Sequence, residues 1–337
     1  MVRAVPEFLP PPPLDLDALR AGRLARLRET MVDHGLDVCV LSNPVNLRYA
    51  ADYRGFPLFQ SHIPSTYLLV PAEGPLVLYG GYSGPLETID DVRPAHSVTA
   101  FDAGMDLSTV AAGFAADVAA YLSEVGLPPT AAVGLERTSP SGHAALADTD
   151  LRVVDAEPVV EQARSRKSPL ELDALRYSID VAEHGMAAME AALVSGISEN
   201  QLWSILHQVN IAHDGDWIDG RMLCSGPRSN PWYQEASDRS IQVGDLVPFD
   251  TDMIGPFGYC ADISRTFLCG GVPPTADQSD LYELARAEIE HNTALLHVGA
   301  SFRELSQAVL RQPDDVVAQR YVCAFHGAGM SDEYPKI

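Results

Sequence analysis

The stretch that decides the fold is residues 249–267, which read FDTDMIGPFGYCADISRTF. Asp250 and Asp252 are two positions apart, so on one β-strand their side chains would point to the same side. Glycine and proline at 255–258 supply turn residues, and Asp262 then lies on a return strand within cross-strand reach. The stretch therefore predicts a β-hairpin that gathers three carboxylates.

Two interpretations of this hairpin are open. Aspartate is unfavourable in strands and acidic chains expose many carboxylates, so the hairpin could lie at the surface. Its flanks at 246–249 and 263–268 are apolar enough for a buried sheet, and buried carboxylates share a site only with protons or a cation. We therefore favour a divalent metal site, and oxygen and imidazole ligands would suit Fe, Mn, Co or Zn.

A histidine near the end of the chain extends this hypothesis. Residues 320–325, RYVCAF, predict a short strand that delivers His326 at the start of HGAG. The two glycines let the backbone pass close to a site. A lone histidine is more often structural than ligating, but the glycine context and the acidic hairpin favour a ligand here.

These segments resemble the pita-bread superfamily of creatinase, prolidase, Xaa-Pro aminopeptidase and methionine aminopeptidase. The resemblance rests on GDLV at 244–247, the aspartate hairpin, DISRTF at 262–267 and HGAG at 326–329, in that order. It implies an α/β creatinase-like N-terminal domain and an α+β pita-bread C-terminal domain. The superfamily binds a dinuclear divalent metal centre through two Asp, one His and two Glu.

Three departures from the peptidase pattern narrow the resemblance. Thr251 stands where the peptidases have their first metal aspartate, and aspartates flank it on both sides. Trp232 replaces the histidine of a Pro-His step that follows SGP at 225–227, and Asp332 replaces a second histidine after the HGAG motif. Both histidines that assist peptide hydrolysis are therefore absent.

These departures resemble the DddP-type dimethylsulfoniopropionate lyases, which share the Asp-Thr-Asp hairpin, an Asn-Pro-Trp segment and a His-Gly-x-Gly-x-x-Asp-Glu ending. The resemblance implies a metal-dependent lyase that removes the proton α to a carboxylate and releases dimethyl sulfide and acrylate. It implies Asp332 as the base, Tyr321 as a substrate-positioning residue and four metal ligands. The implied ligands are Asp250, Asp252, Asp262 and His326.

The cationic end of such a substrate calls for an aromatic or anionic cradle. Trp232, Tyr233 and Tyr321 are the candidates, although each aromatic is individually more typical of ordinary packing. Two other functions stay open. One is a Xaa-Pro dipeptidase or aminopeptidase that tolerates the changed histidines, and the other is a non-catalytic pita-bread module that binds a partner.

The superfamily takes its two glutamate ligands from strands that follow the His-Gly motif. This sequence ends at Ile337, eleven residues after His326, and Glu333 is too close to that histidine to be either ligand. We therefore expect a C-terminally truncated member with an incomplete catalytic domain, and we assign the activity to the intact gene product.

The predicted organisation is an extended proline-rich arm at 1–14, a creatinase-like domain at 15–162 and a pita-bread domain at 163–337. At the boundary, Ser168 is a plausible helix N-cap, with Pro169 at the first helical position and Glu171 three residues after the cap. Apolar spacing predicts helices and strands in α/β alternation before this boundary. The predicted elements are helices at 16–34, 107–124, 169–193, 199–213, 277–297 and 301–311, and strands at 36–42, 66–70, 76–79, 131–135 and 151–154.

Composition excludes several classes of partner. Lys and Arg number 23 against 46 Asp and Glu, for a net charge of −23, and such a surface repels nucleic acid and anionic membranes. No stretch approaches the roughly 20 apolar residues of a membrane span. The five cysteines include no CxxC pair, which favours a reducing cytoplasm over a disulfide framework. The resemblance to the pita-bread superfamily also implies that the protein is a homodimer and acts on a small-molecule substrate.

Overall fold

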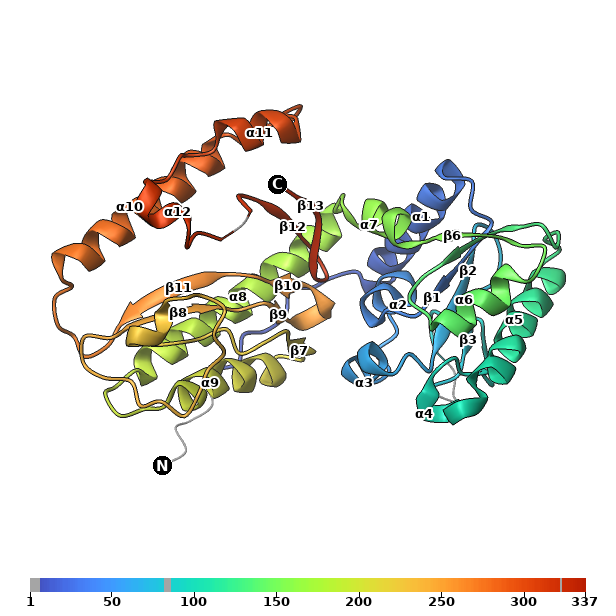
Figure 1. Cartoon of the computed structure of the whole chain (residues 1–337), viewed down its shortest axis with the longest axis horizontal. Coiled ribbons are helices and arrows are strands. Elements are labelled where there is room, and N and C mark those ends of the chain that lie inside the picture. Colours follow the sequence, from blue (N-terminus) through green and yellow to red (C-terminus); the bar gives the residue numbers. More distant parts are fainter. Residues whose placement is uncertain (1–6, 82–85, 322) are drawn as a thin grey trace. The chain divides into compact units, whose positions relative to one another are not determined.

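The computed structural model describes residues 7–81, 86–321 and 323–337. The chain divides into two compact units (Figure 1), which are described separately. One unit is Asp15–Glu171, and the other is Leu172–Ile337 together with the residues before Asp15. The division therefore falls inside α8 (Pro169–Ala192), a few residues after the boundary expected from the sequence.

The unit Asp15–Glu171 is built on a mixed sheet with the strand order β4-β3-β2-β1-β5-β6 in its described part. Strands β1, β5 and β6 are mutually parallel, while β2 runs antiparallel to both β1 and β3. The strands are β1 (Val38–Leu41), β2 (Tyr67–Pro71), β3 (Val77–Tyr79), β4 (Asp91–Arg93), β5 (Ala132–Leu135) and β6 (Arg152–Asp155).

Helices cover this sheet and complete the predicted α/β domain. Every residue of β1 and β5 is buried, as expected for central strands with both faces covered. The helix α5 (Leu107–Glu124) buries Phe114, Val118 and Tyr121 at helical spacing. The other helices of this unit are α1 (Leu16–Asp33), α2 (Pro44–Ala51), α3 (Pro57–His62), α4 (Ala100–Ala103), α6 (Pro140–Ala147) and α7 (Glu157–Arg164).

The segment 43–49, which follows β1 and for which no helix was predicted, is mostly helical. The Asn43 side chain accepts a hydrogen bond from the backbone N–H of Val45, and Pro44 is the first residue of α2. The buried Glu136 carboxylate also accepts from the backbone N–H groups of Ser42 and Asn43. A carboxylate and an Asn cap at a helix N-terminus both favour helix initiation, and the sequence reading missed this signal.

In the other unit, α8 and α9 (Glu199–Ala212) cover short antiparallel strands (Figure 1). Ser168 and Glu171 exchange the predicted capping hydrogen bonds at the start of α8. The apolar core joins both helices to the strands through buried residues such as Met189, Leu206 and Phe249. The strands are β7 (Trp217–Ile218), β8 (Leu246–Asp250), β9 (Met253–Ile254), β10 (Cys260–Ala261), β11 (Ser264–Leu268), β12 (His326–Ala328) and β13 (Asp332–Lys336).

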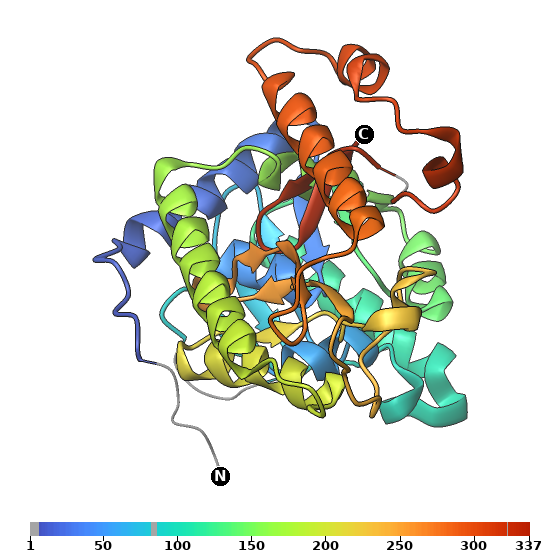
Figure 2. The ribbon, with the colours of Figure 1, turned by 90° about the vertical axis from the view of Figure 1, so that its left-hand side faces the viewer.

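The remaining helices, α10 (Ala276–Ala294), α11 (Phe302–Ala308) and α12 (Asp314–Val317), lie between β11 and β12 in sequence. Figure 2 shows α8 and α10 on different sides of the strands. Helices between antiparallel strands are the order expected for a pita-bread domain, so the predicted fold class is confirmed. Of the predicted arm, residues 1–6 lie outside the described part, and Leu9 exchanges hydrogen bonds with His213 and Tyr177.

The predicted continuous hairpin is broken in the structure. Strand β8 pairs with β11, and β9 pairs separately with β10. Between β8 and β9 the backbone of Asp252 adopts a left-handed conformation with φ of 37°. The expectation that Asp250 and Asp252 lie on one regular strand is therefore wrong, because β8 ends at Asp250 and the backbone kinks at Asp252 before β9 begins.

The predicted strand at 320–325 is also wrong, since the strand β12 begins only at His326. The N–H groups of Ala324 and Phe325 bond to Ile337, and β12 then pairs with β13. Within the described residues, no strand lies opposite 320–323. A β-strand needs a partner for its backbone groups, so the described residues 320, 321 and 323–325 form no strand despite their β-favouring composition. Val322, also part of this prediction, lies outside the described residues.

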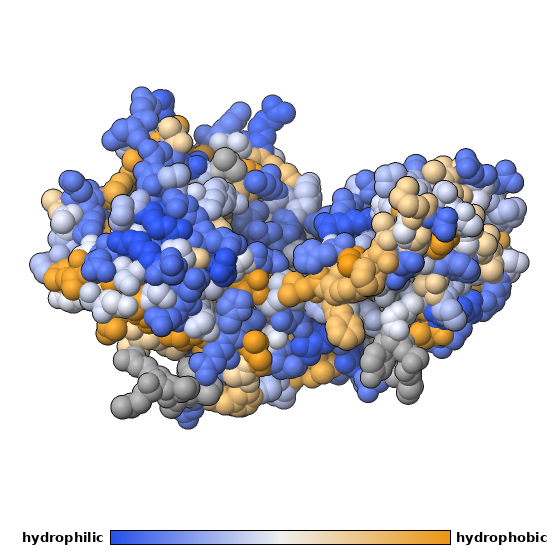
Figure 3. Space-filling model, turned by 60° about the horizontal axis from the view of Figure 1, so that its bottom comes forward, coloured by the Kyte–Doolittle hydropathy of each residue, from blue (hydrophilic) through white to orange (hydrophobic). Residues whose placement is uncertain are grey.

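The surface agrees with the composition of the chain. The face drawn in Figure 3 is largely hydrophilic and carries separate apolar patches. None of the described helices combines the length and apolar character needed to cross a membrane.

Candidate metal centre

Three carboxylates meet where β8, the kink and the β10–β11 junction come together. Asp250, Asp252 and Asp262 each offer an oxygen, and these oxygens lie within 4.8 Å of one another. Burial, and then the charge of Asp250, raise the pKa of Asp252 to about 6 and hold that of Asp262 far above its usual range. Both shifts mean that the three carboxylates disfavour full ionisation unless a cation neutralises them.

A second group shares Asp262 with the first. Asp262, His326 and Asp332 also present ligand atoms within 4.8 Å of one another. His326 Nε2 lies 3.0 Å from Asp262 Oδ2, while Nδ1 lies 2.9 Å from its acceptor, the carbonyl oxygen of Gly327. With the proton on Nδ1, the lone pair of Nε2 faces the carboxylates and is available to a metal.

These residues fit a divalent cation. Their donors are carboxylate oxygens and one imidazole nitrogen, the set that Mn, Fe, Co and Zn accept. Asp262 belongs to both groups, so it is the residue positioned to contact two ions. The four ligands predicted from the sequence thus lie together, while their binding of metal stays a prediction.

The predicted base lies beside this centre. Asp332 is in the first position of β13, with Oδ1 3.9 Å from Nδ1 of His326. Its side chain is 56% exposed, yet its pKa is raised, and loss of hydration is the main cause. The charge of His326 lowers this pKa, and the charge of Asp250 raises it. A carboxylate with a raised pKa is a stronger proton acceptor.

Thr251 fixes the geometry of Asp262, a role that the sequence reading did not assign. The Thr251 side chain is fully buried. Its hydroxyl donates to the carbonyl oxygen of Ala261 at 2.5 Å and accepts from the N–H of Ile263 at 2.9 Å. Both residues beside Asp262 are therefore tied to the loop that carries Asp250 and Asp252.

The predicted substrate-binding aromatics are only partly assembled. The rings of Tyr233 and Tyr321 lie 5.9 Å apart and are tilted by 48°. Lys336 Nζ lies 5.9 Å from the centre of the Tyr321 ring. The half-buried Trp232 precedes Tyr233, but the ring contacts of the described residues do not join it to this pair.

The loop that carries Trp232 and Tyr233 is anchored by a buried glutamate. Glu199, at the start of α9, has no exposed surface and accepts from the hydroxyls of Ser225 and Ser237 at 2.7 Å each. The guanidinium of Arg228 also donates to Glu199. These contacts hold both ends of the segment between 225 and 237.

Asp219 and Trp217 border the metal centre and were not identified from the sequence. The N–H of Asp219 donates to the carbonyl oxygen of Asp252 at 3.1 Å. Asp219 as a whole is exposed, yet loss of hydration at its carboxyl group raises its pKa. The hydrogen bond from the Trp217 indole lowers this pKa, and the charge of Asp332 raises it further. A short strand such as β7 has too few residues to show periodicity, so no sequence signal marks this aspartate.

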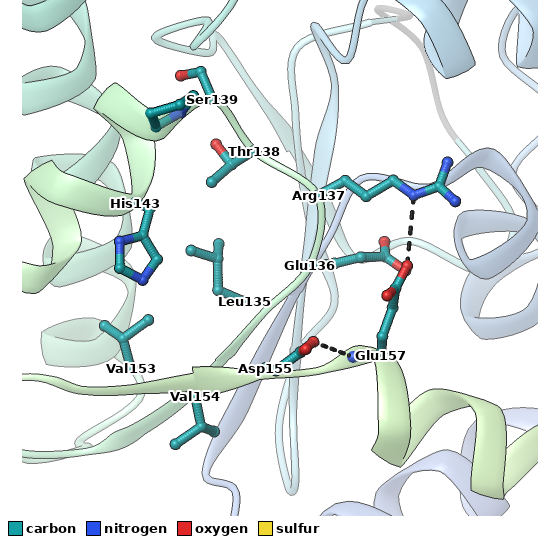
Figure 4. Close-up of a pocket in the computed structure, with 11 residues that line it drawn as sticks. Leu135, Glu136, Arg137, Thr138, Ser139, His143, Val153, Val154, Asp155 and Glu157 are labelled. Atoms are coloured by element: carbon teal, nitrogen blue, oxygen red, sulfur yellow. Dashed lines mark hydrogen bonds and ion pairs between the residues drawn. The ribbon is translucent and has the colours of Figure 1, made fainter.

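The unit Asp15–Glu171 holds a separate cavity of about 480 Å³ (Figure 4). It lies at the ends of β5 and β6, where an ion pair of 3.6 Å joins Arg137 to Glu157 and the N–H of Glu157 bonds to Asp155. None of the predicted site residues lines it.

Comparison with known proteins matches each unit to a family model of its own. Residues 173–336 match metallopeptidase family M24, and residues 23–166 match the creatinase/prolidase N-terminal domain. A dimethylsulfoniopropionate lyase DddP of Roseovarius nubinhibens is 33% identical over 96% of this chain and 74% of its own length. The lyase DddP of Roseobacter denitrificans is 32% identical with the same coverage of both chains.

The fold also matches a Xaa-Pro dipeptidase of Bacillus anthracis. That structure superimposes with a TM-score of 0.68 at 20% identity, over 94% of this chain and 84% of the dipeptidase. At this identity the likeness concerns the fold alone. The chain therefore belongs to metallopeptidase family M24, with the creatinase-type and pita-bread domains of that family, and is similar over most of its length to the dimethylsulfoniopropionate lyases DddP.

Proposed function

We propose that this protein is a metal-dependent lyase that converts dimethylsulfoniopropionate into dimethyl sulfide and acrylate. The observation that carries the proposal is the position of the Asp332 carboxylate beside the candidate metal ligands His326 and Asp262. The chain is also 33% identical to a dimethylsulfoniopropionate lyase. A base next to a centre that binds carboxylates suits proton removal α to a carboxylate.

In the proposed reaction, the Asp332 carboxylate accepts the proton from the carbon α to the substrate carboxylate. The electrons of that C–H bond form the new double bond, the C–S bond breaks, and its electrons leave with sulfur as neutral dimethyl sulfide. A bound divalent cation would stabilise the negative charge that develops toward the substrate carboxylate. We assign its binding to Asp250, Asp252, Asp262 and His326, and two ions to the complete centre.

Tyr321 and Tyr233 are proposed to position the substrate, with Trp232 next to them in the loop. Aromatic faces attract a sulfonium group, which has no hydrogen-bond donor of its own. The position of Tyr321 only a few residues before His326 supports this role, because it links the aromatic pair to the strand that carries a metal ligand. We further propose that the protein is a homodimer and that it is located in the cytoplasm. The free thiol form of the five cysteines is consistent with a reducing cytoplasm.

A Xaa-Pro peptidase is the second candidate, favoured by the fold shared with the Bacillus anthracis dipeptidase. Peptide hydrolysis passes through a tetrahedral oxyanion, and a carboxylate at Asp332 would repel that charge where a neutral imidazole would stabilise it. The indole of Trp232 likewise cannot take up and release a proton as an imidazole can. These two residues support the lyase over the peptidase.

The test compares the wild type with Asp332→Asn and Asp332→His in the presence of Mn²⁺, Fe²⁺, Co²⁺ or Zn²⁺. Headspace gas chromatography measures dimethyl sulfide, and elemental analysis measures bound metal. We expect release by the wild type, loss of more than about 100-fold in both variants as for other general bases, and unchanged metal content in Asp332→Asn. Hydrolysis of Xaa-Pro dipeptides without release of sulfide would replace the lyase by the peptidase.

A further inference from the structure

A tryptophan and a carboxylate lie together at the edge of the metal centre. Trp217 is the first residue of β7 (Trp217–Ile218), and Asp219 follows the strand directly. The indole Nε1 of Trp217 donates to Oδ1 of Asp219 at 2.5 Å. This bond fixes the indole and the carboxylate relative to each other.

The register of β7 against β9 directs this pair to the metal centre. Trp217 lies opposite Ile254 and Ile218 opposite Met253, so the next step of the register sets Asp219 opposite Asp252. The hydrogen bond of 3.1 Å from the Asp219 N–H to the Asp252 carbonyl continues that register.

Asp219 nevertheless stands outside the candidate ligand sets. The two groups of ligand atoms within 4.8 Å, as found among the described residues, contain Asp250, Asp252, Asp262, His326 and Asp332 but not Asp219. Its single described side-chain donor is the Trp217 indole, and the residue is exposed. Asp219 is therefore an exposed carboxylate beside the centre, and among the described residues no side-chain cation pairs with it.

Like charges opposite each other destabilise a pair of strands unless a positive group lies between or beside them. A methylated sulfonium or ammonium group meets this need, because it is attracted to carboxylates and aromatic faces and requires no hydrogen-bond acceptor. We propose that Trp217 and Asp219 form an additional contact to the onium end of a zwitterionic carboxylate substrate, besides the Tyr233 and Tyr321 rings already proposed to position it. This assignment rests on the proposed function and defines its substrate class as onium carboxylates.

The experiment measures preference for positive charge at constant shape. Isothermal titration calorimetry on the Mn²⁺-loaded protein gives the affinities of β-alanine betaine and of its isostere, in which an uncharged tert-butyl group replaces the trimethylammonium group. Both probes carry the same carboxylate, so contacts of that end cancel in the ratio. Variants are Asp219→Asn, which keeps an acceptor for the indole, Trp217→Phe, and Asp280→Asn as a control that removes one exposed charge on α10.

We expect the wild type to prefer the betaine by about tenfold or more. Asp219→Asn should lower that preference by roughly fivefold through weaker betaine binding, and Trp217→Phe by roughly threefold. The control should retain the wild-type ratio. Unchanged metal content and an unchanged urea midpoint in the same samples identify folded variants, and Trp217→Phe tests the contact independently of Asp219→Asn.

Three results would overturn the assignment: a wild type that binds neither probe or does not distinguish them, variants that keep the wild-type ratio, or variants that weaken both probes equally. The last result would place these residues at the carboxylate end or in the fold. Sulfide release is read separately. A protein that prefers the betaine through Asp219 but releases no dimethyl sulfide refutes the lyase and leaves the onium contact, whereas sulfide release with an unchanged ratio in Asp219→Asn refutes the contact alone.

Discussion

Replacing Thr251 with valine should damage the metal centre without touching a predicted ligand. Valine has nearly the volume of threonine but lacks the hydroxyl, so the change removes one hydrogen bond to the Ala261 carbonyl and one from the Ile263 N–H. Thr251 is fully buried, and Ala261 is 1% exposed. Water therefore cannot replace the lost partner of the Ala261 carbonyl.

Each buried polar group left without a partner costs about 1–3 kcal/mol. Two such groups give a loss of roughly 2–4 kcal/mol for Thr251→Val, with the lower contribution from the partly exposed Ile263. Thr251→Ser is the matched control, because it keeps the hydroxyl and loses one methyl group, at about 1 kcal/mol. Metal affinity should fall about 10- to 100-fold in the valine variant, as for other groups that orient a ligand.

Urea unfolding followed by tryptophan fluorescence measures the stability change. The three tryptophans, Trp203, Trp217 and Trp232, all belong to the unit Leu172–Ile337, so the signal reports on that unit alone. Calorimetric titration with Mn²⁺ measures the affinity. A valine variant with wild-type affinity, or a serine variant impaired as strongly as the valine one, would refute the argument that the hydroxyl positions Asp262.

Two further predictions follow from charges in the same unit. In metal-free protein, Asp262→Asn should raise the urea midpoint, because ionised carboxylates at 250, 252 and 262 repel one another and burial disfavours their charge. With saturating Mn²⁺ the wild type should have the higher midpoint, since it gains binding energy that the variant lacks. A variant that keeps the higher midpoint with Mn²⁺ would contradict a metal site. Glu199→Ala should destabilise this unit by about 3–5 kcal/mol, because it leaves the partly buried Arg228 without its partner carboxylate. The loop between 225 and 237 should then be cleaved faster by trypsin after Arg228, whereas Glu235→Ala, a change at an exposed carboxylate in the same loop, should cleave as the wild type does.

The sequence by itself determined most of the architecture. The helix 16–34, the strands 36–42 and 131–135 and the capping box at Ser168 could be predicted because apolar spacing and cap chemistry are local properties. The residues of the candidate metal centre were also found from the sequence, since aspartates in an apolar hairpin and a histidine before glycines are unusual enough to be noticed alone. Their motif order indicated the family.

Only the tertiary structure decided how those residues meet. The kink at Asp252 depends on two separate strand pairings. The lack of strand structure at the described residues 320, 321 and 323 depends on the absence of an opposite strand among the described residues. The roles of Thr251 and Asp219 arise from contacts across strands, to residues ten to more than thirty positions away. A hydrogen bond to a distant strand leaves no periodic trace in the sequence, because its geometry exists only once the chain has folded and set the register.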